Sequence, residues 1–210
     1  HVEEGLTLET GALIQEVQRE SLMVFSKNNF SNDIFEENTY RLRIPTEAKT
    51  FELTGILPAY GFYFLMEEIR NQRISEAVEE IPYHILPNRI SPQKRCVEHS
   101  RILYFSDDLE NPLPWGTQGK KGLPYETYTL ALTSALISAV FKLGQLTPEV
   151  LLDLNDAQKS GYLSGTPLQE RFPDITTMGQ YWIRSGIAGF QADAARHFYL
   201  PERYTDPFGN

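Results

Sequence analysis

Hydrophobic residues near the start of the chain recur at the spacing of an amphipathic helix. Ile14, Val17, Val24 and Phe25 fall close to one helical face, and the positions between them are largely polar. Residues 8–27 are therefore predicted to form a helix that docks its apolar face on the rest of the protein.

Two short segments that follow alternate between polar and apolar residues, as strands do. Residues 39–44 read Thr-Tyr-Arg-Leu-Arg-Ile until Pro45 interrupts the pattern, and residues 50–53 repeat the alternation briefly. Because the two segments are close along the chain, they predict a small antiparallel hairpin.

Prolines and glycines bound four further segments that we interpret as helices: 58–81, 124–143, 147–161 and 177–200. The third has the firmest start signal, because Thr147 suits an N-cap and Pro148 the first helical position. The expected fold is mainly α, or α+β, with four to five helices and a small antiparallel β element in the first half.

Residues 82–122 are rich in proline and glycine, and within them only 101–105, Arg-Ile-Leu-Tyr-Phe, has the pattern of a strand. We expect 1–210 to form a single domain. In it, this irregular connection divides an N-terminal α/β part (1–81) from a C-terminal helical part (123–210).

Composition indicates a soluble globular protein with a substantial core. Of the 210 residues, 41% are hydrophobic and 12% aromatic, which excludes a disordered chain. The formal net charge of −9 disfavours nucleic acid as a partner, because phosphate binding depends on many lysines and arginines. Cys96 is the one cysteine, which excludes a disulfide within the chain and favours an intracellular, reducing compartment, the cytoplasm or an organelle matrix.

Two uncharged stretches, 53–66 and 127–141, are shorter than the ~20 residues needed to cross a bilayer. No membrane span is expected, and peripheral contact with a membrane stays open. Small residues in the second stretch, such as Ala131, Ser134 and Ala135, favour close approach of another subunit.

Cys96 and His99 are three residues apart, so on a helix a thiol and an imidazole would share one face. Such a pair could activate the thiol or supply half of a metal site. A closed zinc site needs about four ligands, and the other histidines are distant along the chain, so no metal site is predicted.

The segment 181–197, Tyr-Trp-Ile-Arg-Ser-Gly-Ile-Ala-Gly-Phe-Gln-Ala-Asp-Ala-Ala-Arg-His, resembles the stretch of α-amylase-type glycoside hydrolases that ends in the nucleophilic aspartate. The resemblance implies that Asp193 is the nucleophile and that Arg196 and His197 contact sugar. Gln191 stands where that family has an arginine, and the rest of the chain shows no such likeness. Membership of the family is therefore not inferred.

The first functional hypothesis is a protein-interaction or scaffold subunit of a larger assembly, bound to protein partners or to a second copy of the chain. No complete catalytic motif is visible, whereas apolar helices, an acidic N-terminal segment and proline-rich connections suit a chain that lies against a partner.

The alternative is a helical enzyme with a His/Cys/Asp site between the 84–99 loop and the last helix. Its catalytic candidates are His99, Asp193 and His197. Whether the protein is an enzyme, and which cofactor it takes, is unknown from the sequence. A third hypothesis is a small-molecule binding module lined by Phe62, Tyr63, Phe64, Tyr181 and Trp182.

Overall fold

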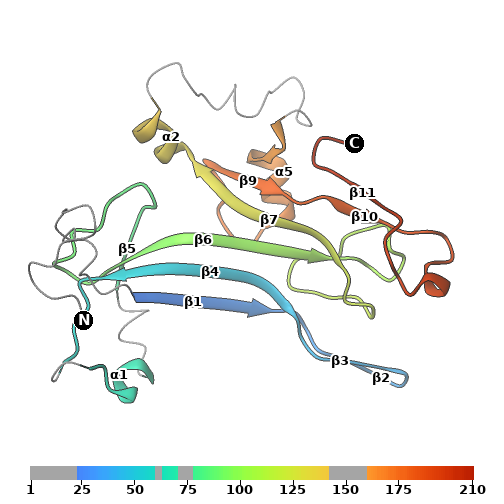
Figure 1. Ribbon diagram of the computed structural model, residues 1–210, viewed down its shortest axis with the longest axis horizontal. Helices are drawn as coiled ribbons and strands as arrows, with labels where there is room; N and C mark the ends of the chain where they lie inside the picture. The colour runs from blue at the N-terminus through green and yellow to red at the C-terminus, as the bar shows by residue number, and fades with distance from the viewer. Residues whose placement is uncertain (1–22, 60–62, 71–77, 142–159) are drawn as a thin grey trace, which may run out of the picture.

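The protein is built around one long, curved β-sheet, as the computed structural model shows (Figure 1). The structure describes residues 23–59, 63–70, 78–141 and 160–210. Seven strands form the sheet in the order β1-β4-β6-β7-β9-β8, all antiparallel, and β5 adds to β6 in parallel. The expectation of a mainly α, helical protein is therefore wrong.

The strands of this sheet are β1 (Met23–Phe30), β4 (Pro45–Thr54), β5 (Glu79–Ile81), β6 (Gln93–Tyr104), β7 (Pro124–Thr133), β8 (Tyr162–Leu163) and β9 (Gln180–Arg184). Two small separate sheets pair β2 (Ile34–Glu36) with β3 (Thr39–Arg41), and β10 (Ile187–Gly189) with β11 (Arg203–Thr205). The helical elements of the described residues are α1 (Met66–Arg70), α2 (Ser134–Val140), α5 (Gly165–Arg171) and the 3-10 turn η2 (Ala194–His197).

The strand β6 lies in the region that the sequence marks as irregular. It is 12 residues long and pairs with β4 on one side and β7 on the other, so the sheet joins strands from before and after 82–122. Three of its buried positions, Gln93, His99 and Arg101, are polar. That polarity conceals the alternation that normally reveals a strand.

The first predicted helix and the predicted hairpin also differ from the structure. Residues 23–27 belong to β1, and 8–22 lie outside the described residues. Residues 39–41 form β3, which pairs with β2, whereas 50–53 lie in β4 between β1 and β6. The alternating pattern locates both strands but not their partners.

The later helices are mostly replaced by strands. Residues 124–133 form β7, and a helix begins only after Thr133, whose Oγ1 accepts a hydrogen bond from the Leu136 amide at 3.1 Å. The 58–81 segment forms the five-residue α1 and then β5. The 177–200 segment forms β9, β10 and η2, and residues 147–159 of the third predicted helix lie outside the described residues.

The hydrophobic core lies on one face of β6, β7 and β9. Its fully enclosed side chains are Leu103, Tyr128, Leu168, Phe172 and Trp182. Leu168 comes from α5, which lies beside β9 (Figure 1). Burial of each such side chain contributes roughly 2 kcal/mol, so this cluster holds the covering segment 165–175 on the sheet.

The described residues contain no helix long and apolar enough to span a membrane.

Candidate functional site

A pair of opposite charges lies inside the protein where β4 and β6 run side by side. Glu47 is directly opposite Arg101 in the register of the two strands, and their exposed fractions are 5% and 1%. Nε of Arg101 donates a hydrogen bond to Oε1 of Glu47 at 2.7 Å. The antiparallel register thus places a carboxylate and a guanidinium in direct contact within the sheet.

The other end of the Arg101 guanidinium contacts Asp174. Nη1 and Nη2 of Arg101 donate to Oδ1 and Oδ2 of Asp174, each at 2.7 Å. The guanidinium also lies over the rings of Trp115 and Phe172, 4.1 and 5.0 Å from their centroids. Arg101 is therefore held by two carboxylates and two aromatic rings.

His99, two residues before Arg101 on β6, contacts the same Glu47 carboxylate. Its Nε2 lies 2.7 Å from Oε1 of Glu47, and its ring packs edge-on against Trp182 at 4.7 Å. Burial lowers the pKa of His99 and outweighs the opposing effect of Glu47. The imidazole is accordingly neutral at pH 7 and donates its Nε2 hydrogen to Glu47.

Glu47 is ionised in this environment. Burial acts to raise its pKa, but the hydrogen bond from His99 and the charges of Arg101 and Lys49 outweigh burial and lower the pKa to about 2. Lys49 lies 3.7 Å from Oε1, and Nδ2 of Asn29 donates to Oε2 at 2.5 Å. Both carboxylate oxygens are thus occupied by groups of the chain itself, which is typical of a network that holds a fold together.

The catalytic candidates from the sequence lie in different settings. His99 is buried in β6, whereas Asp193 and His197 lie at the surface around η2, 3.4 Å apart, with about half of each side chain exposed. No hydrogen bond or ion pair in the described part of the chain joins His99 to either of them. Their catalytic roles remain a prediction.

Cys96 and His99 do not form the expected pair on a helix, because residues 93–104 are a strand. The register of β6 skips Val97, and Sγ of Cys96 donates to the carbonyl of Glu98 at 3.3 Å. Burial raises the pKa of the Cys96 thiol, which opposes a reactive thiolate. Both residues line a cavity of about 40 Å³, and the described residues contain no group of three or more metal-ligating side chains.

The aromatic residues of the third hypothesis are dispersed. Trp182 is fully buried in the core, whereas Tyr63 is 83% exposed. Phe62 lies outside the described residues. Tyr63 and Trp182 therefore do not line a common pocket.

A second buried carboxylate, Glu126 of β7, was not singled out from the sequence. It is 2% exposed, its Oε2 accepts a hydrogen bond from the Tyr128 hydroxyl, and its Oε1 lies 3.8 Å from Nη1 of Arg184. Burial raises the pKa of Glu126. The sequence carried no clear signal for Glu126, because 125–128 read Tyr-Glu-Thr-Tyr, which does not alternate, and its buried positions are Glu126 and Tyr128.

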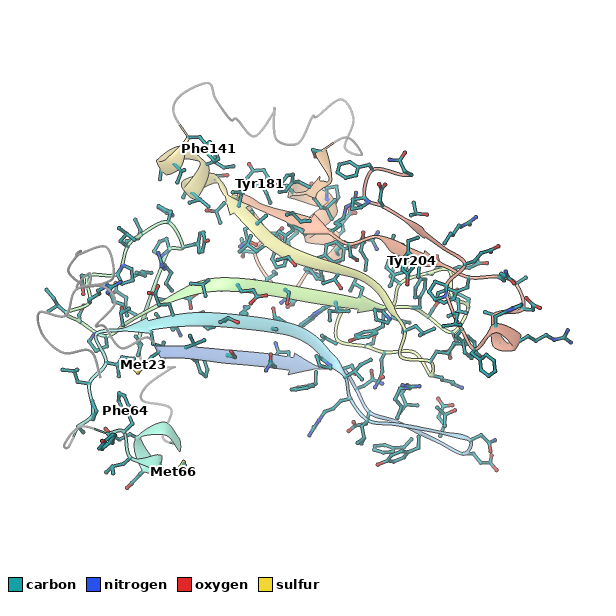
Figure 2. The ribbon with its side chains drawn as sticks, viewed as in Figure 1. Met23, Phe64, Met66, Phe141, Tyr181 and Tyr204 are labelled. Atoms are coloured by element: carbon teal, nitrogen blue, oxygen red, sulfur yellow. The ribbon has the colours of Figure 1, made fainter. Side chains whose placement is uncertain are left out.

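Glu126 lines an open groove of about 580 Å³ between the start of β7 and the β10–β11 sheet. The wall is largely aromatic and proline, with a few small polar residues: Leu123, Pro124, Tyr125, Glu126, Thr127, Ser185, Gly186, Ala188, Phe190, Tyr199, Pro201 and Tyr204. We call this the aromatic groove. Tyr204, on β11, is labelled in Figure 2.

Comparison with protein-family models finds no match, and comparison with curated protein sequences finds none. Comparison with solved structures finds a similar fold in the crystal structure of TcdB2-TccC3, which matches with a TM-score of 0.55 and 15% sequence identity over 88% of this chain. The chain spans 8% of the length of that chain. At this identity the similarity establishes the arrangement of the backbone alone.

Proposed function

We propose that this chain is a protein-interaction module that packs into a larger protein assembly as part of its scaffold. The observation that carries the proposal is the hairpin formed by β2 and β3, which projects from the end of the sheet (Figure 1). Phe35 and Tyr40 are directly opposite each other on this hairpin, and their rings contact at 5.2 Å. They are 65% and 72% exposed.

The base of the hairpin is firmly attached to the body of the protein. Gln118 is buried, and its Nε2 donates to the carbonyls of Asn32 at 2.7 Å and Leu42 at 3.0 Å. Nε of Arg41 donates to the carbonyl of Lys120 at 2.9 Å. An isolated two-stranded hairpin is barely stable in water, so these anchors support an aromatic pair held in a fixed position toward solvent.

Aromatic side chains presented in this way are typical of interface anchors, because a ring buries a large area at low entropic cost. The buried ion network supports the same proposal, because its polar groups bind one another and are not directed at a substrate. The chain is similar in fold to a small part of a long chain in TcdB2-TccC3, which is consistent with a building block of an assembly. The lone thiol supports an intracellular, reducing location as part of the proposal.

Photo-crosslinking tests the proposal. Tyr40 is replaced by p-benzoylphenylalanine, and Met178, which is 86% exposed and lies before β9, is replaced in a matched control. We expect irradiation of cells that express the protein to link position 40 to one partner protein, or to a second copy of the chain, and position 178 to give no such adduct. Absence of adducts at position 40, or equal adducts at both positions, would overturn the proposal.

A further inference from the structure

The aromatic groove contains a buried carboxylate that is incompletely hydrogen bonded. In the described residues, no group donates a hydrogen bond to Oε1 of Glu126, whose nearest cation is Arg184 at 3.8 Å. Nε of Arg184 is buried without a partner among those residues, and its Nη2 donates to the Pro207 carbonyl at 3.1 Å. The Glu47 carboxylate shows the contrast, because one of its oxygens receives both His99 and Arg101.

The groove around this carboxylate has a rigid aromatic wall. The buried ring of Phe105 packs edge-on against Tyr125 at 4.9 Å and against Phe190 at 5.4 Å. Tyr199 has a left-handed backbone with φ of 56°, which costs energy in an aromatic residue and is common at binding sites. Its amide donates to the Ala194 carbonyl at 2.9 Å, which fixes the backbone at this position.

The charges of the groove favour a cation. Among the residues that line it, Glu126 is the one charged side chain. Three cations lie nearby, and none of them is among the residues that line the groove. Arg184 and Arg171 both act on Glu126 by their charge, and Arg184 also bonds the Pro207 carbonyl. Lys121 lies over Tyr199 at 5.5 Å and donates to the Asp107 carbonyl at 2.8 Å. The chain as a whole carries a net charge of −9, so a basic partner is attracted.

Arg101 shows which cation fits such surroundings. Its planar guanidinium bonds carboxylates at its edge while its faces lie over Trp115 and Phe172. A guanidinium is flat and weakly hydrated, so it stacks on rings better than an ammonium does. The aromatic groove likewise has a buried carboxylate beside several rings. No arginine is among the residues that line it.

We propose that the aromatic groove binds an arginine side chain of a partner protein, with the guanidinium donating to Oε1 of Glu126 and stacking on the tyrosine rings. This proposal deepens the interaction role proposed above and rests on it, because it gives the assembly a second contact with a defined chemistry. The exposed Tyr204 forms one wall, and Glu126 forms the floor.

The proposal is tested by adding peptides to the 210-residue chain and measuring the NMR shifts of its backbone amides during the titration. The probes are Ac-Gly-Arg-Gly-NH2, the same peptide with neutral citrulline, and a pentaproline peptide. We expect the arginine peptide to shift the amides of 123–127 and 185–190 and to bind about 5-fold or more tightly than the citrulline peptide, in line with cation–π energies. Equal binding of these two, or binding of pentaproline alone, would overturn the proposal.

Two variants localise the effect. Tyr204→Ala should weaken arginine binding roughly 3-fold or more, whereas Tyr63→Ala, an exposed tyrosine that does not line the groove, should not. Glu126→Gln should abolish the preference for arginine over citrulline, and the Tyr204 comparison still decides the outcome if this buried variant does not fold. If position 40 crosslinks a partner but the peptides bind equally, the groove proposal fails and the assembly proposal stands.

Discussion

Arg101 and Asp174 meet end to end, with both terminal guanidinium nitrogens 2.7 Å from the two carboxylate oxygens. They are 73 positions apart in the chain, one in the middle of the sheet and the other just after α5. The pair therefore ties the segment that covers the core to the strand beneath it.

Replacing Arg101 by lysine should destabilise the protein by about 3 kcal/mol, because an ammonium cannot bond Glu47 and Asp174 together and leaves buried groups unpaired. Urea unfolding followed by circular dichroism measures the change. Arg95→Lys is the matched control, because Arg95 pairs with Glu52 at 2.6 Å in a more exposed place on the same strand. The loss of stability in the Arg95→Lys control should stay below about 1 kcal/mol. Equal losses in the two variants would contradict the central role of Arg101.

Stability should fall at acid pH through Glu47. Its pKa is about 2 in the folded protein against 4.5 for the free group, so its contribution is complete above about pH 4.5 and is lost as the pH falls toward 2. The shift corresponds to about 3 kcal/mol. Urea unfolding at several pH values between 2 and 7 should show the free energy of unfolding falling in this range. Glu47→Gln should be less stable at pH 7, and its free energy of unfolding should depend less on pH below pH 5. A slope unchanged by the substitution would rule out Glu47 as its source.

Protonation of His99 should cause a second loss of stability on acidification, and this loss should begin at a higher pH than the loss due to Glu47. Its folded pKa is lowered from 6.5, so the unfolded chain takes up the proton first, and stability falls as the pH drops below 6.5. His99→Gln keeps a donor for Glu47 but cannot be protonated. We expect this variant to lose the pH dependence that begins below pH 6.5 while keeping the slope due to Glu47 at lower pH. NMR titration of the imidazole gives an independent check, and a folded pKa above 6.5 would show the opposite sign.

Most of β6 was missed from the sequence because polar residues occupy its buried face. In β6, His99 and Arg101 point inward because Glu47, on the neighbouring strand, compensates their polarity. A cluster of charged residues in a sequence normally indicates a solvated loop. Residues 93–104 themselves do not indicate that Glu47, far away in the chain, pairs with His99 and Arg101. The end of β6 was predicted correctly, because 101–105 has the pattern of a strand, but its extent over 93–100 could be inferred only once the pairing with β4 was known.

The helix predicted over 124–143 illustrates a second cause. Thr127, Tyr128 and Thr129 are residues that favour strands, but the uncharged stretch with Ala131 and Ser134 also fits a helix. Pairing with β6 and β9 decides in favour of the strand, and the helix begins only where that pairing ends. The absence of a membrane-spanning helix among the described residues agrees with the sequence analysis. The aromatic groove could not be predicted, because its lining comes from 123–127 and 185–204, which are at least 58 positions apart in the chain.

The thiol of Cys96 should be slow to react. Burial raises its pKa, the negative charge of Glu80 adds to the effect, and its Sγ faces the Glu98 carbonyl rather than the His99 ring. We expect alkylation by iodoacetamide at pH 8 to be about 3-fold or more slower than in an unstructured cysteine peptide, because the thiolate is the reacting form. Labelling in urea should restore the peptide rate, and His99→Gln should leave the native rate unchanged. The Cys96→Ser variant measures the background of iodoacetamide labelling at groups other than this thiol. A native rate above that of the peptide, or one that falls when His99 is replaced, would instead identify a thiolate–imidazole pair and revive the enzyme hypothesis.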